Sequence, residues 1–110
     1  MIRKIGHVGI VVRDIDEAVN FLERVFGLKA ATVKNAMEGG LRIAFVPVGD
    51  DEIELLQPID LGLPIARFLQ ARGQGVHHIC LTTEDVEAEI ARMKKVGVVF
   101  ADERPRTGAH

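Results

Sequence analysis

Three side chains of this sequence are of types that bind divalent metal ions: His7, Glu54 and His78. Each histidine lies in an apolar run rich in β-branched residues, "KIGHVGIVV" for the first and "GVHHIC" for the second, and such runs are typical of strands. Neighbouring side chains of a strand point to opposite faces, so His77 and His78 cannot both face inward. The histidine that faces inward could either bind a metal or fill the core.

A short internal repeat selects one histidine of this pair. The segment "GHVGIVVRDIDEAV" aligns without a gap with "HHICLTTEDVEAEI", which places His7 opposite His78 and Asp14 opposite Asp85. Two copies are too few for a solenoid, which needs about three repeats or more. The repeat therefore predicts that His7 and His78 occupy equivalent positions of two equivalent strands, with His77 on the opposite face.

Two imidazoles and one carboxylate are a ligand set that suits a divalent transition metal with open positions for a substrate. The candidate carboxylate is Glu54 in "EIELL", where it alternates with Ile53 and Leu55 and so faces away from them. The spacing alone leaves a second interpretation open. Histidines in apolar strands often belong to the core, and a glutamate in an alternating strand often faces the solvent.

The elements that would position these residues follow from hydrophobic periodicity and from turn residues. Six runs indicate strands: "KIGHVGIVV", "LKAATVKNA", "LRIAFVPVG", "EIELLQP", "GVHHICLTT" and "VVFADERP". Three segments indicate helices: from Asp14 or Asp16 to Gly27, "LPIARFLQARG" and "EDVEAEIARMKKVG". Between them, "MEGG" predicts a turn whose two glycines are free to take positive φ.

This order predicts an α+β domain over residues 1–110, built from two βαβββ units about a pseudo-twofold axis. The first module covers about residues 1–60, a connecting helix about 63–73, and the second module about 74–110. That second module ends after a single strand that follows its helix. It would therefore lack its last strands, about two of about five or six residues each.

Composition excludes several classes of function. The 110 residues carry a formal net charge of −2 with no basic cluster, so nucleic acid is not an expected partner. The single cysteine excludes an internal disulfide and favours a reducing compartment. No apolar run reaches the roughly 18 residues of a membrane span, and no cleavable signal precedes the first strand, so a cytoplasmic soluble protein is expected. Neither a Ser-His-Asp arrangement nor a phosphate-binding glycine loop is found.

Several segments together carry a resemblance to a known family: "HVGIVVRDIDEAVNFLERVFGL", "LRIAFVPVGDDEIELLQP", "PIARFLQARGQGVHHICL" and "DERPRTGAH". They resemble the methylmalonyl-CoA epimerase branch of the vicinal oxygen chelate superfamily, which also contains glyoxalase I type lyases and extradiol dioxygenases. The combination of "EIELLQP", "PIARFL" and "GVHHI" carries most of the likeness to this branch. The resemblance implies two paired βαβββ modules that form a cupped sheet around one metal ion.

The resemblance also implies roles for particular residues. His7 and His78 match the two histidine ligands, and Glu54 matches a ligand position that is Glu or Gln in the family. The family's fourth ligand is a glutamate in a "GVLIEL"-like motif on the last strand, and that motif would lie beyond His110. Many members have Asp where this chain has Gly6, so support around the first ligand is expected to differ.

The catalytic base cannot be carried over from the family. Some members have a basic glutamate on the strand after the "EGG" turn, but the nearby residues here are Arg42 and Ile43. The base therefore stays unassigned.

The activity that the resemblance implies is interconversion of the two epimers of methylmalonyl-CoA, by proton transfer at the carbon α to the thioester. The implied cofactor is a divalent ion, cobalt or manganese before nickel, zinc or magnesium. The implied partners are an acyl-CoA substrate and a second copy of the chain in a homodimer. Two alternatives remain open: a glyoxalase-like lyase or isomerase on another small carbonyl compound, and a truncated, non-catalytic module whose exposed sheet edges pair with another chain.

Overall fold

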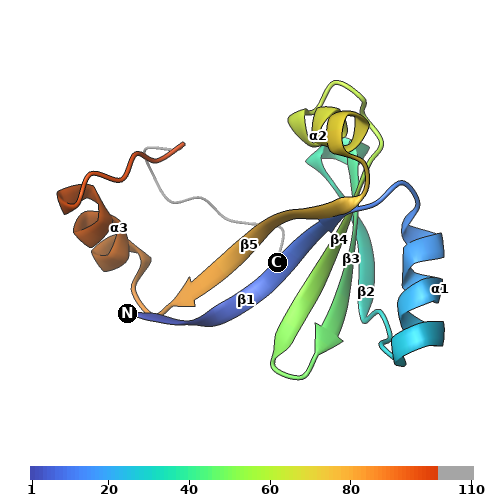
Figure 1. Cartoon of the computed structure of the whole chain (residues 1–110), viewed down its shortest axis with the longest axis horizontal. Helices are drawn as coiled ribbons and strands as arrows, with labels where there is room; N and C mark the ends of the chain where they lie inside the picture. The colour runs from blue at the N-terminus through green and yellow to red at the C-terminus, as the bar shows by residue number, and fades with distance from the viewer. Residues whose placement is uncertain (102–110) are drawn as a thin grey trace. The chain divides into compact units, whose positions relative to one another are not determined.

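The computed structural model describes residues 1–101 (Figure 1). Its elements are β1 (Ile2–Val11), α1 (Ile15–Phe26), β2 (Thr32–Ala36), the 3₁₀ turn η1 (Met37–Gly39), β3 (Leu41–Val48), β4 (Asp51–Pro58), α2 (Pro64–Arg72), β5 (Gly75–Thr83) and α3 (Val86–Lys95). The strands form one five-stranded sheet in the order β2-β3-β4-β1-β5. β1 is parallel to β4, whereas β3 is antiparallel to β2 and β4, so the sheet is mixed.

The helix ends confirm the internal repeat of the sequence. Asp14 caps α1, where its side chain accepts hydrogen bonds from the backbone N–H groups of Asp16 and Glu17. Asp85 caps α3 in the same way and accepts from Ala88 N–H. Such caps satisfy backbone donors that have no partner within the helix. The two aligned aspartates therefore each cap the N-terminus of a helix.

The core lies between α1 and one face of the sheet, and Figure 1 shows α1 alongside β2 and β3. Its buried members come from four elements or their ends: Val12, Ile15, Ala44, Val46 and Leu55. Since side chains alternate along a strand, the residues between these positions face the other way. Pairing of β1 with β4 sets Gly9 beside Glu54, and pairing of β3 with β4 sets Phe45 beside Glu54, so these residues share the face opposite α1.

The described residues form two compact units. One is Ile5–Cys80, which holds the core and most of the sheet. The other combines Met1–Lys4 with the described residues from Leu81 onward. Within it, Thr83 Oγ1 donates to Met1 O at 2.9 Å, and the Glu89 carboxylate lies 2.8 Å from the Met1 amino group. Glu89 also contacts Arg92, and these two hydrogen-bonded cations, the Met1 ammonium first, lower the pKa of Glu89.

One expectation from the sequence is met in part, and another needs correction. Among residues 1–101, the structure shows one βαβββ module followed by β5 and α3, as expected for the first module and the start of the second, and the pairing of two modules stays a prediction. The strand expected over "VVFADERP" is absent from residues 98–101, while residues 102–105 lie outside the described part. The reason lies at the end of α3, where Gly97 has a φ of 92° and Val98 N–H donates to Met93 O at 3.1 Å. These residues close the last turn of the helix and do not begin a strand.

The "MEGG" segment also differs from the expected turn. Positive φ values occur at Met37, Glu38 and Gly39, whereas Gly40 has a φ of −76°. A β-carbon at Gly40 would lie 3.1 Å from Met37 O, so close packing and not positive φ favours glycine there.

No helix among residues 1–101 is long and apolar enough to cross a membrane.

Candidate metal centre

His7, Glu54 and His78 come together on the sheet face opposite α1, within the unit Ile5–Cys80. They belong to β1, β4 and β5, and one potential ligand atom from each lies within 4.8 Å of the others. His7 Nε2 is 3.1 Å from His78 Nε2. The Glu54 carboxylate oxygens lie 3.7 Å from His7 Nε2 and 4.0 Å from His78 Nε2.

Strand register explains why these three residues meet. β1 and β4 are neighbours, and Gly9 pairs with Glu54, so His7 two residues earlier in β1 lies on the same face. β5 follows β1 in the sheet order, on the side away from β4. The ring of His78 must therefore reach across β1 to approach Glu54.

Gly9 provides the space for that reach. A β-carbon built on Gly9 would lie 2.2 Å from His78 Cε1 and 2.7 Å from its Nε2. Real β-carbons do not approach other atoms this closely, so any side chain at Gly9 would displace the His78 ring.

Burial differs among the three side chains. Glu54 is 8 % exposed, His7 17 % and His78 36 %. Burial lowers the pKa of His78, the nearby Glu54 charge opposes this, and His77 and His7 act in the same direction as burial. A lower pKa favours the neutral imidazole at pH 7, which is the form that binds metals.

The chemistry and spacing of these atoms fit a divalent ion. Metal–ligand bonds of about 2.0–2.2 Å place neighbouring ligand atoms about 3 to 4 Å apart, as the three distances here do. Glu54 adds a second argument, since the nearest ionisable groups described, the ring nitrogens of His7 and His78, lie beyond hydrogen-bond distance of its carboxylate. A buried carboxylate is costly unless it is paired or coordinates a cation.

His77 lies outside the cluster but contacts it. Its side chain is exposed, as expected from the sequence, yet His77 Nδ1 lies 2.9 Å from His78 Nδ1. Its ring also meets Phe68 of α2 edge-on, with centroids 4.9 Å apart. The alternation of side chains along a strand did not predict the contact between the two adjacent histidines.

Arg42 and Ile43, the positions near the family's basic glutamate, supply no base on this face. Arg42 faces α1 and makes a two-pronged ion pair with Asp16, at 3.1 and 3.2 Å. Ile43 pairs with Leu56 on the face of Glu54, where it is 1 % exposed.

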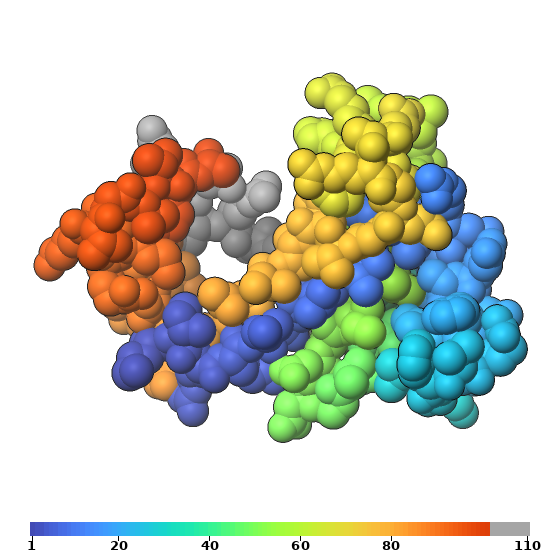
Figure 2. Space-filling view, in the orientation of Figure 1, coloured from blue at the N-terminus to red at the C-terminus, as the bar shows by residue number. Residues whose placement is uncertain are grey.

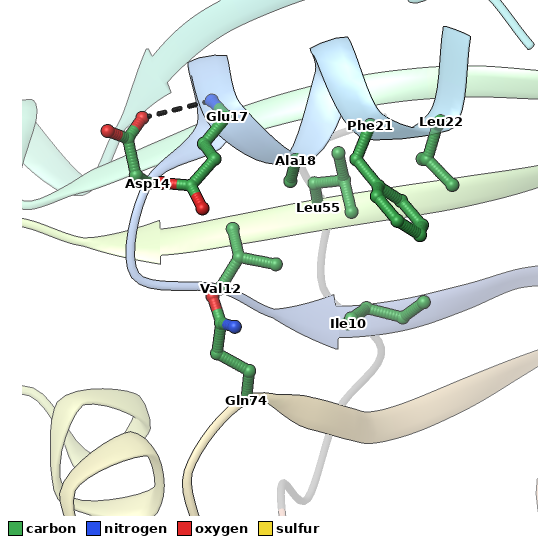
Figure 3. A pocket seen from close by; sticks show the side chains of 9 residues that line it. All are labelled: Ile10, Val12, Asp14, Glu17, Ala18, Phe21, Leu22, Leu55 and Gln74. Atoms are coloured by element: carbon green, nitrogen blue, oxygen red, sulfur yellow. Dashed lines mark hydrogen bonds between the residues drawn. The ribbon is translucent and has the colours of Figure 1, made fainter. Parts of the chain in front are cut away.

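A pocket of about 370 Å³ lies on the other side of the sheet, between α1 and β1 (Figure 3). Apolar side chains line most of it, with Asp14, Glu17 and Gln74 at one end. Its strand residues Ile10 and Leu55 alternate with Gly9 and Glu54, so this pocket does not contain the cluster of His7, Glu54 and His78.

Comparison with known proteins places this architecture in a family. Residues 6–110 match the model of the glyoxalase/bleomycin resistance protein/dioxygenase superfamily. The chain belongs to this superfamily. The vicinal oxygen chelate resemblance found in the sequence is thereby confirmed.

Relatives within the superfamily include methylmalonyl-CoA epimerases. The human mitochondrial enzyme is 32 % identical over 97 % of this chain, which spans 61 % of that enzyme's length. The ethylmalonyl-CoA/methylmalonyl-CoA epimerase of Cereibacter sphaeroides is 34 % identical over 100 % of this chain and 84 % of its own. A structure of Streptomyces coelicolor methylmalonyl-CoA epimerase with 2-nitronate-propionyl-CoA superposes with a TM-score of 0.91 at 30 % identity, covering 99 % of this chain and 80 % of that one.

Proposed function

We propose that this chain is a metal-dependent epimerase that moves a proton at the carbon α to a thioester and interconverts the two epimers of methylmalonyl-CoA. The observation that carries the proposal is the cluster of His7, Glu54 and His78, found in a chain whose relatives include named methylmalonyl-CoA epimerases. Sequence spacing and spatial proximity select the same three side chains.

In the proposed site, His7 and His78 offer neutral Nε2 lone pairs and Glu54 offers a carboxylate oxygen. These residues would hold cobalt or manganese, with nickel, zinc or magnesium as other candidates. When bound, such an ion supplies a Lewis acid that stabilises the negative charge developing on a carbonyl oxygen as the α-proton leaves. With His7, Glu54 and His78 as its protein ligands, the ion would keep open positions at which oxygen atoms of the substrate could bind.

The protein around the cluster orients these ligands and limits water. Phe45 pairs with Glu54 across β3 and β4, so it lies on the same face of the sheet, and it is 5 % exposed. Glu54 is itself buried, and a buried carboxylate attracts a cation more strongly than one in water. His78, the most exposed of the three, marks the side from which substrate would approach.

The test follows the proton directly. The 110-residue chain, loaded with cobalt, is incubated with methylmalonyl-CoA in deuterated water, and deuterium at C2 is measured by mass spectrometry. The proposal predicts incorporation well above that of the metal-free chain and its loss in His7→Ala. If the metal-loaded chain exchanges no faster than cobalt alone, the proposal is wrong.

A second candidate is a glyoxalase-like lyase or isomerase that uses the same ligands on another small carbonyl compound. The observation that favours it is Ile43, a buried apolar side chain on the site face near the position of the family's basic glutamate. Metal-dependent turnover of hemithioacetals or other α-hydroxycarbonyl compounds, without exchange at C2 of methylmalonyl-CoA, would select this candidate.

A third candidate is a non-catalytic module. Large apolar side chains of β5 are half exposed, with Ile79 at 54 % and Leu81 at 49 %. A chain that binds no divalent ion after loading would support this candidate and exclude the first two.

The remaining expectations belong to the same proposal. They are a single domain with an incomplete second module from about residue 74, an acyl-CoA partner, a homodimer and a cytoplasmic location. Light scattering of the purified chain tests the dimer.

A further inference from the structure

His77 is the described residue outside the cluster that makes the closest polar contact with one of its members. The two Nδ1 atoms of His77 and His78 lie 2.9 Å apart, and the two rings are nearly perpendicular, at 89°. The other ring nitrogen of His78, Nε2, is the one that approaches His7 and Glu54. His78 therefore directs one nitrogen at the cluster and the other at its neighbour in sequence.

The chemistry of imidazole makes these two contacts depend on each other. A neutral histidine carries one N–H and one lone pair, and the contact made by one nitrogen sets the state of the other. For Nε2 of His78 to offer its lone pair to a metal, its Nδ1 must carry the proton and needs an acceptor. The lone pair on His77 Nδ1 is such an acceptor.

His77 is itself held in place by α2. The Phe68 ring meets the His77 ring edge-on at 4.9 Å and 81°, and the Arg72 guanidinium lies 5.3 Å from the Phe68 centroid. The space-filling view shows α2, in yellow, directly against the start of β5 (Figure 2). On its other side, His78 lies against Gly9, so its ring is constrained from both directions.

We infer that His77 is a positioning residue, whose Nδ1 accepts a hydrogen bond from His78 Nδ1–H and thereby holds His78 in the tautomer that presents Nε2 to a divalent cation. The contact between His77 and His78 is seen in the structure, but its role in metal binding rests on the proposed function. Residues that orient a metal ligand in this way commonly change metal affinity by about 10- to 100-fold when removed.

Three substitutions separate positioning from packing. His77→Phe keeps a ring that can pack against Phe68 but removes the acceptor, His77→Asn keeps a short side chain with an acceptor oxygen, and Ile79→Ala is the matched control. Ile79 lies two residues along β5 on the same face and is 54 % exposed, so it reports the general effect of a change on this strand.

Two measurements are made on each 110-residue variant. The first is the dissociation constant for Co²⁺, by competition with a chelator of known affinity. The second is the tautomer of His78 in the metal-free protein, read from the ¹⁵N chemical shifts and ring ¹H–¹⁵N couplings of its two nitrogens. A merely structural contact would leave the second measurement unchanged.

We expect the metal-free wild-type chain to hold His78 mainly as the Nδ1–H tautomer. His77→Phe should move the population toward Nε2–H and weaken Co²⁺ binding about 10- to 100-fold, whereas His77→Asn should stay within a few-fold of wild type and Ile79→Ala within about two-fold. An unchanged His78 tautomer in His77→Phe would overturn the inference, whatever the affinity. If wild type binds no Co²⁺, the proposed function fails, and the tautomer still decides the role of His77.

Discussion

The backbone of Gly9 lies against the ring of His78, so closely that a β-carbon at Gly9 would come within 2.2 Å of His78 Cε1. A residue of β1 that carries no side chain is thus what allows a residue of β5 to reach Glu54 of β4. The arrangement of His7, Glu54 and His78 therefore also requires that residue 9 has no side chain.

Gly9→Ala should therefore damage the metal site. The added methyl must push the His78 ring away from Glu54, and we expect Co²⁺ affinity to fall at least about 10-fold, measured by chelator competition. Gly75→Ala is the matched control, because a β-carbon at Gly75 meets no atom within 4 Å and its φ is not positive. Equal affinities for Gly9→Ala and wild type would contradict the described position of His78.

Glu54→Gln tests two effects of the buried charge, on the stability of the metal-free chain and on the binding of a metal ion. Without metal, the substitution removes a buried carboxylate whose nearest described ionisable partners, the His7 and His78 rings, lie at 3.7 and 4.0 Å, so the metal-free Tm should rise or stay the same. With saturating Co²⁺, the gain in Tm should be smaller than in wild type because the ligand has lost its charge. Thermal denaturation with and without Co²⁺ measures both effects, and an unchanged metal-dependent gain would exclude Glu54 as a ligand.

The stability of the metal-free chain should fall as the pH drops below about 6.5. Burial lowers the pKa of His78 below its unfolded value, so on acidification the unfolded state takes up this proton first. The contribution of neutral His78 is thus present above pH 6.5 and is lost as the pH falls through the lower, folded pKa. Urea unfolding from pH 7.5 to 5 should give a smaller slope of free energy against pH for His78→Ala than for wild type; equal slopes would contradict the pKa shift.

Asp14→Ala should destabilise the unit Ile5–Cys80 by about 1 kcal/mol, because two backbone N–H groups of α1 lose their acceptor. Urea unfolding at pH 7 measures the change. Glu23→Ala, an exposed change near the other end of the same helix, should be within about 0.5 kcal/mol of wild type. Similar losses for both variants would show that helix propensity, and not the cap, sets the effect.

Much of the fold could be predicted from the sequence, because its signals are local. Asp14 and Gly27 mark the ends of α1, and the alternation around Glu54 gives its face without knowledge of its neighbours. The internal repeat was decisive for the site, since among the patterns within the sequence it alone distinguished His78 from His77, in agreement with the family resemblance. The gathering of His7, Glu54 and His78 was expected, and the structure brings them together.

What could not be predicted depends on distant contacts. His77 contacts both His78 and Phe68 of α2, which is distant in the sequence, and no pattern in "GVHHIC" predicts these contacts. The strand expected near residue 98 was wrong for residues 98–101, because β-branched residues there follow a glycine that closes α3. Two paired modules, the second incomplete, were inferred from two similar segments. Similar segments specify similar local structure, here β1 with α1 and β5 with α3, and the pairing of the modules stays a prediction.

The most direct test of the account is the number of Co²⁺ ions bound per chain. The wild-type chain, titrated with Co²⁺ and followed by the visible absorption of the bound ion, should bind one ion per chain. His7→Ala and His78→Ala should each weaken or abolish that absorption, whereas Ile79→Ala should leave it intact. Absence of specific Co²⁺ binding by wild type, or unchanged binding by both histidine variants, would contradict the assignment of His7, Glu54 and His78 as a metal centre.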